Sequence, residues 1–339
     1  MPEKLSPEAF LDAATHYPIL DVRSPGEYLR AHIPGAVSFP IFDDAERARV
    51  GTTYKQIGKD EAIELGLEIV GPKLATWVKM AKKLAVDNTV LVHCWRGGMR
   101  SGSMSWLFET AGLKVKILVG GYKAYRNYVL AEFDRKIPFV VLGGKTGSGK
   151  TDILLEMQKR GAQVIDLEGV AHHRGSVFGH FGLAPQPTSE HFENEVVAQL
   201  RGMDYSKPIW IEDESQRIGS VNIPHLLWAT IRKQPVIFID IPFAERVKHI
   251  VSEYGSLEKE KLIVAVSRIQ KRFGPNETKV TIQDLNEDRV DSAFSQLLKY
   301  YDKAYEKSLF KREDITLLLH KKPFDNVNAD FISEFLTSL

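Results

Sequence analysis

The stretch Pro138-Phe-Val-Val-Leu-Gly-Gly-Lys-Thr-Gly-Ser-Gly-Lys-Thr151 determines the fold of the second half of the chain. An apolar, β-branched run ends in glycines, and the spacing from Gly144 to Gly149-Lys150-Thr151 completes the phosphate-binding loop pattern. The glycines let backbone N–H groups surround a phosphate chain, Lys150 supplies a charge and Thr151 can bind Mg²⁺. We expect a strand, then this loop, then a helix over 152–160. The predicted phosphate-binding residues are Gly144, Lys145, Thr146, Gly147, Ser148, Gly149, Lys150 and Thr151.

Further apolar runs follow the phosphate loop, and stretches of helical character separate them. They lie at residues 163–167, 208–211, 236–240 and 315–319. A chain that alternates strands and helices forms a mostly parallel sheet with right-handed crossovers. We therefore expect an α/β domain at residues 134–339 with a P-loop kinase-like, doubly wound parallel sheet.

Three consecutive acidic residues, Glu212, Asp213 and Glu214, follow the run at 208–211. They come at the end of an expected strand, where the ligand crevice of an open α/β sheet lies. In a P-loop protein an acidic residue at this place holds Mg²⁺ or a catalytic water. We assign Glu212 and Asp213 to the site, and a Mg²⁺ ion, if one is used, would be bound by Thr151 and Asp213. We expect no other metal.

Two arginines complete the residues that we assign to this site. Arg174 follows a pair of histidines beyond the second expected strand, and Arg217 lies just after the acidic run. Both can contact a phosphate group. The alternative for the histidine-rich segment is a capped turn with solvent-facing side chains. Phe178, Phe181 and Phe192, in and after the next segment, would form an apolar pocket, a base-stacking surface or ordinary core.

The only cysteine of the chain begins a second glycine-rich loop, His93-Cys-Trp-Arg-Gly-Gly-Met-Arg100, after the strand-like run 88–92. Successive N–H groups of such a loop form an anion-binding nest, and nearby arginines and a helix N-terminus favour a thiolate. We predict that Cys94 is a catalytic thiol, because glycines and arginines are unusual in a core. The alternative is a small buried core thiol. The predicted anion-binding residues of this loop are Arg96, Gly97, Gly98 and Arg100.

The residues around this loop indicate a separate α/β domain at 1–133. Strand-like runs lie at 17–23 and 115–119, and apolar residues recur at helical spacing over 74–84. The segment Ser24-Pro-Gly-Glu27 is a helix capping box with proline at the first helical position. Capping accounts for Glu27, so we give it no catalytic role.

Composition agrees with a two-domain globular protein. The chain has 339 residues, 43% hydrophobic and 26% charged, and its single cysteine excludes a disulfide framework. It has neither an apolar signal region at the N-terminus nor a run long enough to span a membrane. We expect a cytoplasmic monomer. The net charge of +1 does not by itself indicate a nucleic-acid-binding protein.

Several motifs of the first domain resemble those of the rhodanese (sulfurtransferase) family, in which the loop cysteine carries a persulfide. They are Asp21-Val-Arg23, Ala31-His-Ile-Pro-Gly-Ala36, the Cys94 loop and Leu118-Val-Gly-Gly-Tyr122. The Cys-x₅-Arg spacing is one residue longer than in simple rhodaneses, and with His93 it also resembles dual-specificity phosphatases. A longer loop suits a tetrahedral anion.

Both domains together, in this order, resemble the tRNA 2-selenouridine synthase family over nearly the whole chain. The most specific motifs are the Cys94 loop, the phosphate loop, Asp166–Ser176 and Glu212–Gly219. The resemblance implies a transferase that acts on 2-thiouridine at the tRNA wobble position, first geranylating sulfur from geranyl diphosphate and then exchanging S-geranyl for selenium from selenophosphate. It implies these two co-substrates, no tightly bound cofactor, and possible contact with a selenophosphate-producing enzyme. The phosphate loop then need not hydrolyse ATP.

Two other functions stay open from the residues alone. One is a phosphatase–kinase fusion that uses the Cys-x₅-Arg loop and an ATP-binding phosphate loop, and the other is a nucleotide-gated binding module. If tRNA is the substrate, it would bind through local basic residues at the domain junction. The candidates are Lys123, Arg126, Arg135 and Lys136.

Overall fold

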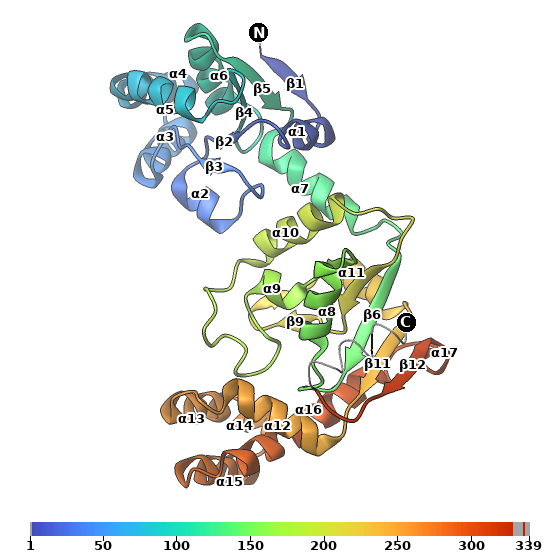
Figure 1. The fold of residues 1–339 in the computed structure, drawn as a ribbon. Coiled ribbons are helices and arrows are strands. Elements are labelled where there is room, and N and C mark those ends of the chain that lie inside the picture. Colours follow the sequence, from blue (N-terminus) through green and yellow to red (C-terminus); the bar gives the residue numbers. More distant parts are fainter. Residues whose placement is uncertain (1, 328–334, 336–339) are drawn as a thin grey trace. The chain divides into compact units, whose positions relative to one another are not determined.

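Two five-stranded parallel β-sheets, one in each half of the chain, form the framework of the protein (Figure 1). The computed structural model describes residues 2–327 and 335. Strands buried on both faces of a parallel sheet are apolar along their length, and this explains the unbroken apolar runs in the sequence.

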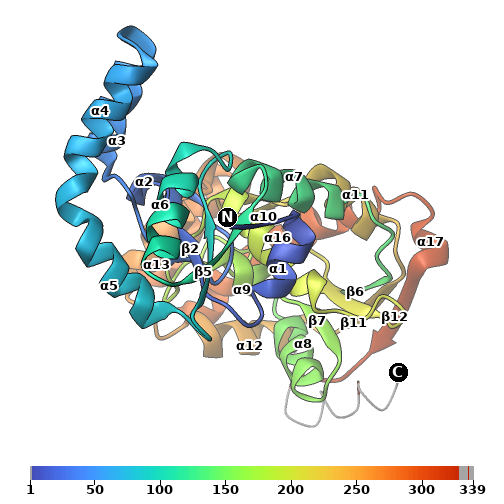
Figure 2. The same ribbon diagram turned by 90° about the horizontal axis from the view of Figure 1, so that it is seen from above.

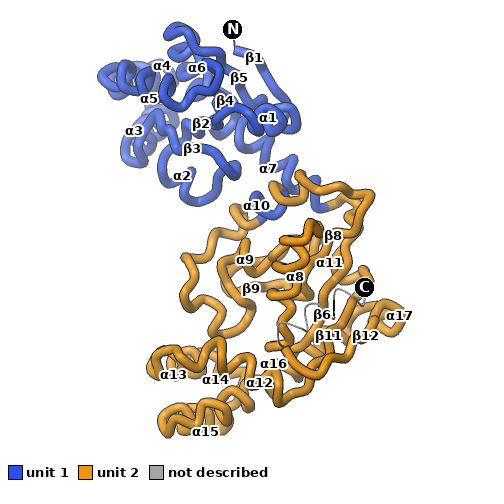
Figure 3. The backbone as a smooth tube through the Cα atoms, in the orientation of Figure 1, with its two compact units in different colours: residues 1–133, 193–197 blue, residues 134–192, 198–339 orange. Residues whose placement is uncertain are grey.

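The chain divides into two units, coloured separately in Figure 3. Unit 1 consists of residues 1–133 and 193–197, and unit 2 of residues 134–192 and 198–339. Unit 1 therefore includes part of a helix that lies far along the sequence. On that helix, Asn194 hydrogen-bonds to the hydroxyl of Tyr122 and to the backbone oxygen of His32.

The elements of unit 1 are β1 (Glu3–Leu5), α1 (Pro7–Ala13), β2 (Ile19–Asp21), α2 (Pro25–Arg30), β3 (Val37–Ser38), α3 (Asp44–Gln56), α4 (Lys59–Val70), a 3₁₀ turn (Gly71–Lys73), α5 (Leu74–Leu84), β4 (Thr89–His93), α6 (Met99–Thr110), β5 (Lys114–Leu118) and α7 (Gly121–Glu132). The sheet order is β1-β5-β4-β2-β3, with all pairs parallel. The predicted α/β architecture of this unit is confirmed.

Side chains of β4 alternate between the two faces of this sheet. Val90, Val92 and Cys94 belong to the core cluster formed with α5 and α6. His93 points to the other face, where its ring contacts Phe10 of α1 and Tyr122 of α7. The strand thus carries Cys94 to the α6 side of the sheet.

The helices α3 and α4 pack side by side and were not predicted from the sequence (Figure 2). A capping box begins α3, because Asp43 accepts from the backbone N–H of Glu46 while the Glu46 carboxylate accepts from the backbone N–H of Asp43. This signal is readable from the sequence and would have located the first helix.

The elements of unit 2 are β6 (Phe139–Gly144), α8 (Lys150–Lys159), β7 (Gln163–Ile165), α9 (Leu167–Ala171), the part of α10 (Ser189–Arg201) outside 193–197, β8 (Ile209–Glu212), β9 (Arg217–Ile218), β10 (Val221–Asn222), α11 (His225–Arg232), β11 (Val236–Asp240), α12 (Phe243–Tyr254), α13 (Lys259–Arg268), α14 (Gln270–Phe273), α15 (Pro275–Asn286), α16 (Val290–Leu309), α17 (Ile315–Leu318) and β12 (Leu319–Pro323). The main sheet has the order β12-β11-β6-β8-β7, all parallel, and β9 and β10 form a separate antiparallel pair.

The phosphate-loop strand β6 is the central strand of this sheet, as a doubly wound sheet requires. Chain order reverses between β6 and β8, so the crevice at their carboxyl ends is the expected ligand position. The predicted parallel α/β sheet is confirmed.

One predicted strand was wrong in position. Residues 315–318 form the helix α17, and the last strand begins only at Leu319. β12 is an edge strand, paired with β11 alone among the described strands, and it contains His320, Lys321 and Lys322. Edge strands tolerate polar and charged residues, so this strand lacks the apolar pattern that indicated the others.

Candidate active sites in the two units

The Cys94 loop joins the end of β4 to the start of α6. Cys94 is 3% exposed, and its sulfur lies 3.2 Å from the hydroxyl oxygen of Ser101. The thiol is therefore more buried than the glycines and arginines of the loop led us to expect. Trp95, Arg96, Gly97 and Gly98 are exposed, so the thiol lies directly beneath a surface loop.

Backbone hydrogen bonds from the start of α7 hold the Cys94 loop. The backbone N–H of Tyr122 donates to the oxygen of Cys94, and that of Lys123 donates to the oxygen of Trp95. Gly121 has a φ of +62°, and a Cβ there would lie 2.4 Å from the Cys94 oxygen. Only glycine allows the two segments to approach this closely. This contact explains the glycine that directly precedes Tyr122.

Arg100 is positioned by Glu27 at the edge of the loop. Its guanidinium lies 2.6 Å from the Glu27 carboxylate, and both side chains are partly buried. Burial alone lowers the pKa of Arg100, but the hydrogen bonds and charge of Glu27 outweigh that effect and raise it. Glu27 caps α2 as predicted, and it also holds the cation, which the sequence did not indicate.

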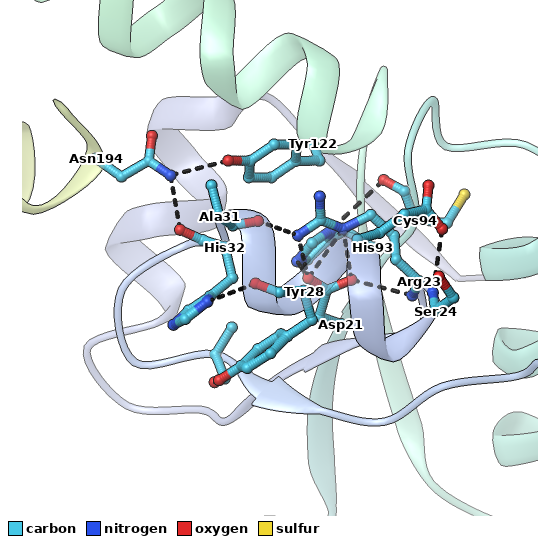
Figure 4. Close-up of polar contacts among 12 residues, drawn as sticks. Asp21, Arg23, Ser24, Tyr28, Ala31, His32, His93, Cys94, Tyr122 and Asn194 are labelled. Atoms are coloured by element: carbon cyan, nitrogen blue, oxygen red, sulfur yellow. Dashed lines mark hydrogen bonds and ion pairs between the residues drawn. The ribbon is translucent and has the colours of Figure 1, made fainter. Parts of the chain in front are cut away.

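A buried ion pair lies beside the carboxyl ends of β2 and β4 (Figure 4). Arg23 donates to both carboxylate oxygens of Asp21 and to the backbone oxygen of Ala31, while the ring of Tyr122 lies 3.8 Å from the guanidinium. Burial lowers the pKa of His93 next to this pair, so the imidazole is neutral at pH 7. Buried charges persist only when they are paired and hydrogen-bonded. This cluster therefore fixes the strand ends that carry the Cys94 loop.

In unit 2 the predicted phosphate-binding residues lie between the end of β6 and the first turn of α8. The ammonium of Lys150 lies 3.0 Å from the backbone oxygen of Gly144, across the loop. Arg246, which is paired with Asp302, donates to the backbone oxygen of Thr146. Lys145 instead forms an ion pair with a glutamate of α16 at 2.7 Å. Contacts with other residues of unit 2 thus hold the phosphate loop in place.

A cluster of three carboxylates lies beside the phosphate loop. One oxygen from each of Glu168, Glu212 and Glu214 lies within 4.8 Å of the others. The hydroxyl of Thr151 is 3.5 Å from Glu168, and the ammonium of Lys150 is 3.6 Å from Glu212. Oxygen ligands at this spacing next to a phosphate loop are those that Mg²⁺ prefers.

Burial raises the pKa of all three carboxyls, and the charges of neighbouring carboxylates raise it further. The pKa of Glu168 rises to about 11, with burial the main cause and the charges of Glu212 and Glu214 adding to it. The pKa of Glu214 rises to about 8, with burial the main cause and the charges of Glu212 and Asp213 adding to it. Groups that are so costly to ionise are stabilised as anions by a bound cation.

Two buried oxygens at this place have no hydrogen-bond partner among the described residues: the hydroxyl of Ser148 in the phosphate loop, and one carboxylate oxygen of Glu212. Buried polar atoms are normally satisfied, by protein, water or a bound ion. These orphaned atoms agree with a site built for a cation and a phosphate chain.

Asp213, which we assigned as a partner of Thr151, is not part of this cluster. Its carboxylate accepts a hydrogen bond of 2.8 Å from the hydroxyl of Tyr305 and forms an ion pair with Arg312. Tyr305 also approaches the backbone nitrogen of Gly144 at 3.2 Å. Asp213 therefore ties α16 to the phosphate-loop strand. Its neighbours Glu212 and Glu214 are the candidate ligands instead.

The two predicted arginines have partners outside the carboxylate cluster. Arg174 forms an ion pair with Glu253 at 2.9 Å, and Arg217 on β9 donates to the backbone oxygen of Gly219. Gly175, which follows Arg174, approaches closely, because a Cβ there would lie 2.7 Å from a carboxylate oxygen of Glu168. The backbone of the histidine-rich segment thus passes directly against the Glu168 carboxylate at Gly175.

The phenylalanines after this segment pack chiefly in the interior. Phe178 and Phe192 are buried, and Phe178 packs against Phe294 and Tyr254 in a helical core cluster that Phe181 also contacts. Core packing, one of the predicted explanations, accounts for them.

Glu168 and Glu214 were not assigned to the site from the sequence. Glu214 stood in the acidic run, and Glu168 follows Asp166 just after β7. Carboxyl ends of parallel strands meet at one edge of the sheet, so acidic residues after two such strands are the signal that would have found the pair.

Arg126, a candidate for tRNA contact, is already paired. It forms an ion pair with Glu193 and a hydrogen bond with Asn194, all within unit 1. Lys123, and in unit 2 the candidates Arg135 and Lys136, are exposed.

In the part of the chain that the structure describes, no helix has both the length and the hydropathy of a membrane span. A family model described as the tRNA 2-selenouridine synthase AAA domain matches residues 137–331, and a rhodanese-like domain model matches residues 6–128.

Relatives with the name tRNA 2-selenouridine synthase match both halves of the chain. One from Bdellovibrio bacteriovorus is 39% identical over 251 residues, covering 70% of this chain and 64% of the relative. One from Shewanella piezotolerans is 33% identical over 338 residues, covering 88% and 90%. The chain thus spans slightly less than two thirds of the first of these relatives and most of the second. The chain belongs to the tRNA 2-selenouridine synthase family.

Proposed function

We propose that the protein converts 2-thiouridine at the tRNA wobble position into 2-selenouridine, with geranyl transfer in unit 2 and selenium exchange in unit 1. The observation that carries the proposal is the match of both units to proteins named tRNA 2-selenouridine synthase. The two anion loops, one with a thiol and one with a carboxylate cluster, suit two different chemical steps.

Geranyl transfer needs stabilisation of a leaving diphosphate. When the allylic C–O bond of geranyl diphosphate breaks, negative charge builds on the diphosphate. The sulfur of 2-thiouridine takes the geranyl carbon, and the N3 proton of the base goes to water. Lys150 and the N–H groups of the phosphate loop stabilise that negative charge. Glu168, Glu212 and Glu214 with Thr151 would hold Mg²⁺, and a bound Mg²⁺ would supply further charge to the diphosphate.

Selenium exchange needs a tetrahedral anion held beside the nucleobase. The selenium of selenophosphate attacks C2 of the S-geranylated base, the C2–Se bond forms, and the C2–S bond breaks to release geranylthiolate, which takes a proton from water. Water then cleaves the Se–P bond, leaving 2-selenouridine and phosphate. Arg100, held by Glu27, and the Cys94 loop would bind the anion. In this sequence of steps Cys94 orients selenophosphate and forms no bond to its selenium.

Partners follow from the same proposal. Transfer RNA is the substrate, and an enzyme that makes selenophosphate supplies the second step. We expect a monomeric cytoplasmic enzyme without a tightly bound cofactor.

The test replaces Cys94 by Ala. We expect loss of selenium incorporation with geranylation largely intact, because the thiol and the phosphate loop lie in different units. Mass spectrometry of the wobble nucleoside would then show accumulated S-geranyl-2-thiouridine. Normal production of 2-selenouridine by Cys94→Ala would exclude a chemical role for the thiol, and ATP turnover without any change in tRNA would favour a kinase instead.

A further inference from the structure

A hollow of about 610 Å³ lies in unit 1, between the helix pair α3–α4 and the first turns of α6. Ligand-binding pockets typically have volumes of roughly 300 to 1,000 Å³. The hollow exists because four small residues, Ala48 and Gly51 of α3 and Ala62 and Gly66 of α4, line it. Larger side chains at these positions would close the space.

The lining of the hollow is predominantly apolar. Phe42, Val50 and Val70 form part of its wall, and Leu67, although 63% exposed, also lines it. Exposed apolar side chains that gather around a concave surface indicate a binding site rather than a random surface pattern. The hollow therefore suits a hydrocarbon group.

Three cationic residues, Arg47, Lys55 and Arg100, also line the hollow, and none of its described lining residues is acidic. Arg47 is largely exposed and approaches Glu27 only at 4.0 Å, so much of its charge faces solvent. An apolar floor with positive charge around it fits an apolar chain that is attached to an anionic molecule.

The hollow is continuous with the Cys94 loop. Met99, Arg100 and Ser103 of α6 line it, and Ser101 on the same turns lies 3.2 Å from the Cys94 sulfur. Met99 and Arg100 belong both to this lining and to the segment that directly follows the Cys94 loop glycines, so a ligand in the hollow lies next to that loop. A chain in the hollow can thus end at the reacting centre.

We propose that this hollow binds the geranyl chain of S-geranyl-2-thiouridine while the base lies at the Cys94 loop. The inference rests on the proposed function and locates its apolar subsite. Geranylthiolate must leave within this unit when the C2–S bond breaks and the C2–Se bond forms. The hollow holds the chain of that leaving group, whose sulfur then takes a proton from water.

The same hydrocarbon chain also occurs in free geranyl diphosphate, so the experiment must separate the two sources. Gly51→Leu fills the hollow, because no atom lies within 4 Å of a Cβ added there. Gly51→Ala fills less of the hollow than Gly51→Leu does. Alanine and leucine both favour a helix more than glycine does, so neither variant should weaken α3. Arg49→Leu adds the same apolar group to α3 outside the hollow and is the matched control.

Three rates are measured for each variant: selenation of tRNA that already carries S-geranyl-2-thiouridine, selenation of tRNA that carries S-methyl-2-thiouridine, and geranyl transfer from geranyl diphosphate. For Gly51→Leu we expect kcat/KM of the first to fall at least about tenfold, since displacing two methylene groups from an apolar pocket corresponds to roughly that factor. The other two rates should not change, and Ala should give a smaller effect than Leu.

Equal selenation of geranylated tRNA by Gly51→Leu and Arg49→Leu would overturn the proposal. A fall in geranyl transfer alone would also overturn it, because the hollow would then hold geranyl diphosphate. If the wild-type protein selenates no tRNA, the proposed function fails, and calorimetric binding of the S-geranyl-2-thiouridine nucleoside decides the hollow separately. Binding by the wild type that Gly51→Leu loses would support the subsite, and equal or absent binding would refute it.

Discussion

Replacing Lys150 by Met tests the electrostatics of the phosphate loop. Lys150 is 12% exposed, and its ammonium lies 3.6 Å from Glu212, which is 2% exposed. It is a source of positive charge beside three carboxyls. Methionine keeps the length of the side chain and removes the charge. The variant must then leave Glu212 either buried as an unpaired anion or protonated.

Protonation limits the loss of stability. The ordinary pKa of this carboxyl is 4.5, and each pH unit above it adds about 1.36 kcal/mol to the cost of protonation. Through Glu212 the variant can therefore lose at most about 3.4 kcal/mol of unfolding free energy at pH 7, and at most about 0.7 kcal/mol at pH 5. A carboxyl whose pKa is raised by folding loses its stabilising contribution as pH rises, so the deficit must grow with pH.

Urea unfolding of the wild type and Lys150→Met at pH 5, 6 and 7 measures this deficit. Adding Glu212→Gln to Lys150→Met should recover most of the loss at pH 7, because the buried charge is gone. Lys159→Met, on the exposed end of the same helix, is the control and should change little. A deficit that is equal at pH 5 and pH 7, or a double variant no more stable than the single one, would refute the reasoning.

The same variant reports on catalysis. A charge-assisted contact contributes about 1.5–3 kcal/mol, so geranyl transfer should fall roughly 10- to 150-fold. Geranyl transfer by the double variant should stay at least as low as that of Lys150→Met although its stability returns, since it still lacks Lys150. Geranyl transfer at the wild-type rate by folded Lys150→Met would remove the phosphate loop from the mechanism.

Mg²⁺ affinity should increase from pH 6 to pH 8, because Mg²⁺ competes with protons for carboxyls such as Glu214, whose pKa is raised to about 8. Calorimetric titration at pH 6, 7 and 8 measures this affinity, and a pH-independent affinity would contradict the cluster. In the absence of metal, the stability of the protein should depend on pH in the opposite direction to Mg²⁺ affinity. The contribution of Glu214 to stability is largest below pH 4.5 and is lost as pH rises towards 8. For tRNA, Lys123→Ala should reduce the slope of log affinity against log salt by about 1, whereas Arg126→Ala should leave it unchanged because Glu193 already pairs with that arginine. Equal slopes for the two variants would rule out Lys123 as a phosphate contact.

Local sequence was sufficient to identify both loops and the sheets that present them. A phosphate loop needs glycines, Lys150 and Thr151 at fixed spacing after an apolar strand, and this pattern can be read without any long-range contact. The Cys94 loop is equally local, since strand, glycines and helix are consecutive in the chain. The edge strand β12 was misplaced because charged residues occupy it.

Side-chain partners were decided only by the tertiary structure. Arg100 and Glu27 are 73 residues apart, and Asp213 and Arg312 are 99 apart, so no local pattern predicts either pair. The carboxylate cluster likewise requires β7 and β8 to lie side by side, which brings Glu168 next to Glu212. The hollow beside Cys94 depends on how α3 and α4 pack. Sequence patterns report the backbone conformation that neighbouring residues prefer, whereas charge pairing and cavities arise from contacts between distant segments.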